Sequence, residues 1–92
     1  MSIQWLFDVI ESRRQNPTEQ SYTSSLFAAG LPKIAQKVGE EGTEVVVAAL
    51  AQDNQRLIEE VADLTYHTLV LLAARGLKVE DILTELEKRH QQ

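Results

Sequence analysis

The chain has 92 residues, the length of one domain, and its composition, 43% hydrophobic and 25% charged, excludes a disordered protein. The net charge of −5 argues against a nucleic-acid-binding groove, and the absence of cysteine excludes disulfides and thiolate metal sites. We therefore expect one domain over residues 1–92, with a thin core that association with a second copy reinforces.

The first half of the chain predicts short helices. Residues 3–14 carry apolar side chains at helical spacing, with Ser2 as a candidate N-cap, and Asn16-Pro17 ends this helix. A polar segment that includes Tyr22 and Thr23 then leads into a short apolar helix, residues 26–29, which stops at a glycine.

The second half predicts two long helices and a final short one. Residues 31–51 and 54–75 each carry an apolar stripe of helical period, and the tight turn between them makes the two helices antiparallel. Residues 79–90 form the last helix, and no alternating strand pattern occurs. The predicted fold is an all-α helical bundle, built on this central hairpin and completed by dimerisation.

The same pattern argues against a membrane protein. The longest apolar-rich run, residues 61–74, contains Asp63 and His67 and is too short to span a bilayer. The first residues also lack the basic and apolar regions of a signal peptide. We therefore expect a cytoplasmic protein with no membrane partner.

The acidic residues are concentrated on the predicted hairpin. Residues 40–63 hold seven acids and one arginine, which accounts for the whole acidic excess of the chain. Glu44 and Glu60 lie at equal distances from the turn, and so do Glu41 and Asp63. Antiparallel packing would therefore bring four carboxylates together beside the apolar stripes.

Such a cluster predicts a metal site. Close carboxylates repel one another, and Mg²⁺ removes this penalty because it prefers oxygen ligands and bridges carboxylates to phosphates. The alternative is a solvated acidic face, which is common where acids recur at i, i+3, but the second acidic pair makes it less attractive.

Basic side chains share the arc of the first long helix that carries its acids. Lys33 and Lys37 are either phosphate contacts or simple charge balance for the neighbouring glutamates. His67 follows Asp63 by one helical turn, and a structural hydrogen bond to Asp63 or to a backbone carbonyl is a better interpretation than a catalytic role.

Several segments together resemble one enzyme family. They are Ser21-Tyr22-Thr23, Gly30-Leu31-Pro32-Lys33-Ile34, Lys37-Val38-Gly39-Glu40-Glu41 with Glu44, Glu60-Val61-Ala62-Asp63-Leu64 with Tyr66-His67, and Leu71-Leu72-Ala73-Ala74-Arg75-Gly76-Leu77. The chain resembles the phosphoribosyl-ATP pyrophosphohydrolases of histidine biosynthesis, members of the all-α MazG-like superfamily, over residues 3–90.

The resemblance implies Mg²⁺-dependent hydrolysis of phosphoribosyl-ATP to phosphoribosyl-AMP and pyrophosphate by a homodimer or larger homo-oligomer. It implies that Glu40 orients or activates water and that Lys37 has a catalytic role. The implied metal ligands are Glu41, Glu44, Glu60 and Asp63, and the implied substrate contacts are Tyr22, Thr23, Lys33 and Lys37.

Two alternatives remain open from the sequence. One is a related house-cleaning hydrolase of non-standard or deoxynucleotides, which would lack the Ser21-Tyr22-Thr23 segment. The other is a non-catalytic helical dimerisation module, which would have no reason to place its acids in register about the turn.

Overall fold

The computed structural model describes residues 1–90, and within them every regular element is a helix. The five helices are α1 (Ile3–Gln15), α2 (Tyr22–Ala29), α3 (Leu31–Ala51), α4 (Asn54–Ala74) and α5 (Val79–Arg89). The predicted all-α fold is confirmed. None of these helices has the length and apolarity needed to cross a bilayer.

Side-chain N-caps determine where α1, α2 and α4 begin. The hydroxyl of Ser2 accepts a hydrogen bond from the backbone N–H of Trp5, as the sequence predicts. At α2, the hydroxyl of Ser21 accepts from the N–H of Ser24. This helix therefore begins at Tyr22, earlier than the predicted apolar segment 26–29, and the expectation that Tyr22 and Thr23 precede the helix is wrong.

Two glycines with positive φ mark the helix boundaries. Gly30, at φ 99°, separates α2 from α3, and Gly76, at φ 72°, follows the end of α4. After α4, the N–H of Leu77 donates to the carbonyl of Leu72 and the N–H of Gly76 donates to that of Ala73. This pair of bonds is a Schellman motif, which turns the chain away from α4 and sets the start of α5.

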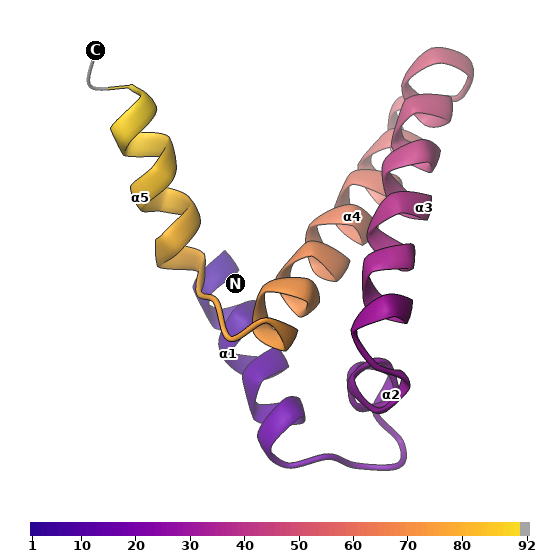
Figure 1. Cartoon of the computed structure of the whole chain (residues 1–92). Coiled ribbons are helices and arrows are strands. Elements are labelled where there is room, and N and C mark those ends of the chain that lie inside the picture. The colour runs from indigo at the N-terminus through magenta and orange to yellow at the C-terminus, as the bar shows by residue number, and fades with distance from the viewer. Residues whose placement is uncertain (91–92) are drawn as a thin grey trace.

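The molecule is an open arrangement around the α3–α4 hairpin. In Figure 1 the antiparallel helices α3 and α4 form one arm, α1 and α2 lie at its base, and α5 forms a second arm that diverges from the hairpin. The radius of gyration is 14.4 Å, whereas a compact domain of this length has about 12 Å. The difference reflects the two arms, which do not cover each other.

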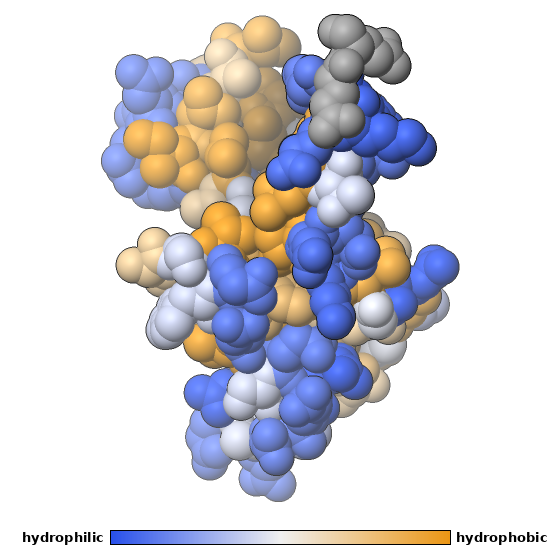
Figure 2. All heavy atoms as spheres, turned by 90° about the vertical axis from the view of Figure 1, so that its left-hand side faces the viewer, coloured by the Kyte–Doolittle hydropathy of each residue, from blue (hydrophilic) through white to orange (hydrophobic). Residues whose placement is uncertain are grey.

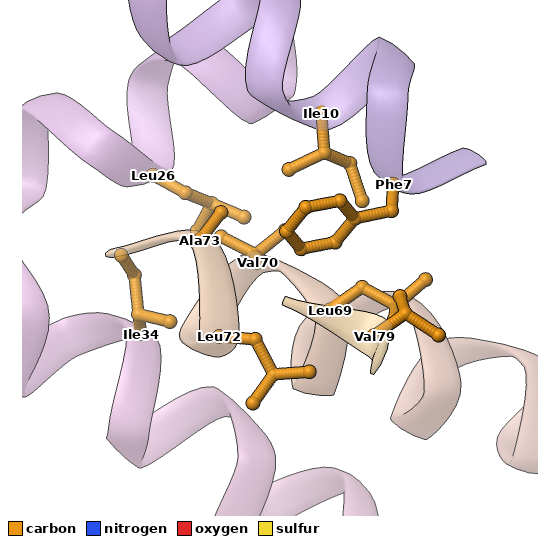
Figure 3. Close-up of a cluster of buried hydrophobic side chains, with 9 residues drawn as sticks. All are labelled: Phe7, Ile10, Leu26, Ile34, Leu69, Val70, Leu72, Ala73 and Val79. Atoms are coloured by element: carbon orange, nitrogen blue, oxygen red, sulfur yellow. The ribbon is translucent and has the colours of Figure 1, made fainter. Parts of the chain in front are cut away.

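The hydrophobic core lies at the base of the hairpin. Figure 3 shows side chains from all five helices converging there. They are Phe7, Ile10, Leu26, Ile34, Leu69, Val70, Leu72, Ala73 and Val79. The carboxyl-terminal half of α4 is therefore held on several sides, which gives the residues just before it a fixed position.

The far half of the hairpin has little core of its own. Ala48 is its only buried apolar residue in the part of the chain that the structure describes, and it is 1% exposed. The exposed large apolar side chains there are Val46, Val47, Leu50, Ile58 and Val61. These five residues are here called the hairpin apolar face, and three of them, Val46, Ile58 and Val61, belong to the apolar stripes predicted from the sequence.

Candidate metal and substrate site

Three carboxylates from α3 and α4 converge where the core ends and the far half of the hairpin begins. One oxygen each from Glu41, Glu60 and Asp63 lies within 4.8 Å of the others. We call these three residues the acidic cluster. Glu41 stands on α3, whereas Glu60 and Asp63 stand one helical turn apart on α4, so antiparallel pairing of the helices creates the cluster.

The two glutamates of the acidic cluster are buried, and one oxygen of each has no partner. Glu41 is 7% and Glu60 5% exposed, whereas Asp63 is exposed. Oε2 of Glu41 and Oε2 of Glu60 accept no hydrogen bond within the described structure. A buried carboxylate oxygen without a donor is energetically costly, which indicates that a cation or donor from outside the chain completes this site.

Glu44 lies at the edge of the acidic cluster. It is exposed, is outside the group of three oxygens, and lines a small pocket with Glu60 at the far end of the hairpin. The neighbouring Glu44 carboxyl raises the pKa of Glu60, and burial raises it further. Ionised acids therefore repel one another here, as expected for a site that takes a cation.

Within residues 1–90, Arg56 is the only permanently charged base that forms an ion pair with the acidic cluster. Its Nη2 lies 2.6 Å from Oε1 of Glu60, and its Nη1 donates to Glu59. The sequence interpretation missed this contact. The signal was present, because Arg56 precedes Glu60 by four residues and is the one base in the acidic segment.

Hydrogen bonds connect α2 to the α4 turn that carries Asp63. Nδ1 of His67 lies 2.8 Å from the backbone carbonyl of Asp63, so it is the donor in that bond, and Nε2 lies 3.1 Å from the hydroxyl of Tyr22. The expected structural bond of His67 to a backbone carbonyl is confirmed. Thr23 exchanges a hydrogen bond with the hydroxyl of Tyr66, a residue to which the sequence interpretation gave no role.

These bonds fix the orientation of the predicted substrate contacts on α2. The rings of Tyr22 and Tyr66 stack with centroids 6.2 Å apart, and Tyr66 meets His67 edge to face at 5.0 Å. Tyr22 is nevertheless 53% exposed, so one side of its ring faces solvent. Nδ1 of the buried His67 also lies 3.9 Å from Oε1 of Glu41, which places this aromatic group next to the acidic cluster.

The remaining predicted residues lie on α3 outside the acidic cluster. Glu40 is exposed and accepts a hydrogen bond from the side chain of Gln36 at 3.1 Å. Lys33 is exposed and Lys37 is half-buried, and neither forms an ion pair within residues 1–90. The i, i+4 pair between Lys37 and Glu41 that the charge-balance interpretation requires is therefore not formed.

The donor set suits a hard divalent cation. All three candidate ligand atoms of the acidic cluster are carboxylate oxygens. The two oxygens that lack a hydrogen-bond partner belong to Glu41 and Glu60, which are members of the cluster. Hard cations such as Mg²⁺ and Ca²⁺ prefer oxygen ligands, whereas softer metals favour the sulfur and imidazole donors that the cluster lacks.

Comparison with known proteins gives the family. The family model described as phosphoribosyl-ATP pyrophosphohydrolase matches residues 4–90. A phosphoribosyl-ATP pyrophosphatase of Lacticaseibacillus casei is 56% identical over 88 residues, which are 96% of this chain and 80% of that protein. One of Clostridium botulinum is 51% identical over 86 residues, covering 94% of this chain and 78% of the relative.

A longer relative contains the same region as part of its chain. The histidine biosynthesis bifunctional protein HisIE of Bacteroides thetaiotaomicron is 49% identical over 90 residues, which are 98% of this chain and 44% of that protein. The match to the family model spans almost every residue that the structure describes and includes the acidic cluster and the α2 contacts. The chain therefore belongs to the phosphoribosyl-ATP pyrophosphohydrolase family.

Proposed function

We propose that this protein hydrolyses phosphoribosyl-ATP to phosphoribosyl-AMP and pyrophosphate in the cytoplasm, as a step of histidine biosynthesis. The observation that carries the proposal is the family match over residues 4–90, and the acidic cluster supports it with a site suited to phosphate chemistry. In the reaction, water attacks a phosphorus, the phosphoanhydride bond breaks and pyrophosphate leaves.

The metal in this proposal is Mg²⁺, held by Glu41, Glu60 and Asp63, with Glu44 as a fourth ligand from the edge of the cluster. When bound, Mg²⁺ neutralises charge on phosphate oxygens and lowers the pKa of water. The two partnerless oxygens of Glu41 and Glu60 support this assignment. The closeness of Glu44 to Glu60 supports its place in the set.

The other predicted residues take their roles from where they stand around the acidic cluster. Glu40, next to Glu41 in the chain, would orient the attacking water and accept its proton. Lys33 and Lys37 would contact phosphate oxygens, and Lys37 would stabilise the charge of the leaving pyrophosphate. Tyr22, which hydrogen-bonds to His67, and Thr23, which hydrogen-bonds to Tyr66, would contact the nucleotide.

The direct test is an incubation of the purified protein with phosphoribosyl-ATP and Mg²⁺, with pyrophosphate as the measured product. We expect pyrophosphate and phosphoribosyl-AMP in equal amounts, and much slower reaction with ATP or dUTP. Faster hydrolysis of dUTP would indicate a house-cleaning enzyme instead. No hydrolysis of any of the three nucleotides would favour a non-catalytic module.

We also propose that the protein acts as a homodimer or larger homo-oligomer. Apolar side chains gather at the top and across the middle of the face shown in Figure 2. The hairpin apolar face is exposed, and so is a groove of about 370 Å³ between α4 and α5 that Leu64, Leu72 and Leu83 help to line. A single chain leaves both uncovered, and exposed apolar surface of this kind is typical of an interface.

Light scattering at micromolar concentration tests this association. We expect a mass at least twice the 10.3 kDa of one chain. Ile58→Lys places a charge in the hairpin apolar face, where Ile58 is 61% exposed, and should shift the population toward monomer. Gln55→Lys adds the same charge at a polar, exposed position of α4 and should leave the mass unchanged. A stable folded monomer of the unaltered chain would contradict the proposal.

A further inference from the structure

We propose that Arg56 is an internal counter-ion for Glu60 that competes with the metal and thereby sets the metal affinity of the site. The inference rests on the proposed metal site and adds a residue to it. Arg56 has no role in the predictions from the sequence, and it comes from α4, the helix that also carries Glu60 and Asp63.

The contact between Arg56 and Glu60 uses the carboxylate that the metal requires. Nη2 of Arg56 lies 2.6 Å from Oε1 of Glu60, whose side chain is only 7% exposed. The other oxygen of Glu60 has no partner. The guanidinium of Arg56 therefore pairs with one oxygen of the buried Glu60 carboxylate and leaves the other oxygen without a partner.

The position of Arg56 is unfavourable for its helix, so the pairing with acids must offset a cost. α4 begins at Asn54, and the N-cap Asp53 accepts a hydrogen bond from the backbone N–H of Arg56 at 2.9 Å. Arg56 thus stands in the first helical turn, where the helix dipole favours acidic and disfavours basic side chains. Glu59 and Glu60, both in contact with its guanidinium, supply the compensating charge.

Glu59 remains as a partner of the Arg56 guanidinium when the Glu60 carboxylate binds the metal. Arg56 already donates to Glu59 and is 48% exposed, and the Glu59 side chain is 44% exposed. Release of Glu60 therefore leaves Arg56 with an ion pair in solvent rather than a buried, unpaired charge. This second partner lowers the cost of the exchange between guanidinium and metal, because no uncompensated charge is left behind.

Calorimetric titration of the full chain with Mg²⁺, without substrate, tests the competition. Arg56→Gln should bind Mg²⁺ about three- to tenfold more tightly, since the metal no longer displaces a cation. Arg56→Lys keeps the charge but cannot engage two carboxylates through a planar fork, so its affinity should lie between the two. Arg89→Gln removes an exposed guanidinium paired with Glu85 on α5 and should change nothing.

Thermal unfolding in EDTA supplies a second readout. Without Arg56 the ionised cluster loses its counter-ion, so Arg56→Gln should melt about 2–4 °C lower than the unaltered protein. The difference should shrink or reverse at saturating Mg²⁺.

Several outcomes overturn the inference. Equal or weaker Mg²⁺ binding by Arg56→Gln would mean that Arg56 supports Glu60 in the metal-bound state instead of competing. A gain in Mg²⁺ affinity by Arg89→Gln as large as that by Arg56→Gln would mean that only the net charge of the protein matters. If the unaltered protein binds no Mg²⁺, both this inference and the proposed metal site fail, whereas the other two results leave the proposed function intact.

Discussion

Asp63→Asn should lower kcat for phosphoribosyl-ATP about 10²–10³-fold while the protein stays folded. The side chain is exposed, so the substitution disturbs no packing, and asparagine keeps the shape while removing the charge. A carboxylate that holds a catalytic metal contributes several kcal/mol of transition-state stabilisation, which gives a loss of this order. Far-UV circular dichroism checks that the helices remain.

Thermal unfolding separates loss of the metal from damage to the fold. Mg²⁺ at about 100 times its dissociation constant should raise the melting temperature of the unaltered protein on the order of 10 °C. Asp63→Asn should lose most of this rise. In EDTA the variant should melt at or above the unaltered protein, because one repelling charge of the acidic cluster is gone.

Two comparison variants make this prediction specific. Glu44→Gln should lose less activity than Asp63→Asn, because Glu44 lies outside the group of three oxygens within 4.8 Å. Glu87→Gln removes an exposed acid from α5 and should behave like the unaltered protein. Near-normal turnover of Asp63→Asn at limiting Mg²⁺ would exclude Asp63 as a ligand.

Local sequence patterns predicted the helices well because the determinants of helix ends are themselves local. The boundaries of the predicted hairpin, 31–51 and 54–75, differ from α3 and α4 by a single residue. Counting residues from the turn also predicted that Glu41 and Asp63 lie at the same level of the hairpin, and the structure places them together. Both results depend only on helical rise and on antiparallel pairing.

The apolar stripes were less informative about burial. The apolar stripe predicted on the second long helix includes Ile58 and Val61, which are 61% and 43% exposed. Leu69 and Val70 of the same helix, by contrast, are buried. Helical period shows that a face is apolar but does not show which chain covers it. Here the base of the hairpin is covered by α1, α2 and α5, whereas apolar side chains of its far half are exposed.

The contacts that cross between distant segments could not be read from periodicity. Tyr22 and His67 are 45 residues apart, and the hydrogen bond between them depends on how α2 packs against α4. The sequence singled out Tyr22 through the family resemblance alone. The pairing of Thr23 with Tyr66 has the same origin in tertiary packing.

Lys37→Met tests whether the half-buried lysine of α3 acts on substrate phosphate. As a helix ion pair with Glu41 it would contribute only about 0.3–0.5 kcal/mol to stability. That pair is not formed within residues 1–90, although Lys37 and Glu41 are one turn apart on one helix. The amine is therefore free to approach a phosphate that reaches the acidic cluster, and methionine retains the apolar stem while removing the charge.

The two interpretations of Lys37 predict opposite results. A phosphate contact in a site shielded from water contributes several kcal/mol in the transition state, so its loss should lower kcat/KM about a hundredfold with little change in melting temperature. A surface lysine predicts near-normal catalysis, as we expect for the control Lys88→Met on α5. The measurement is kcat/KM for phosphoribosyl-ATP at saturating Mg²⁺. A loss below about threefold, or ~0.65 kcal/mol, would show that Lys37 contacts no phosphate in the transition state.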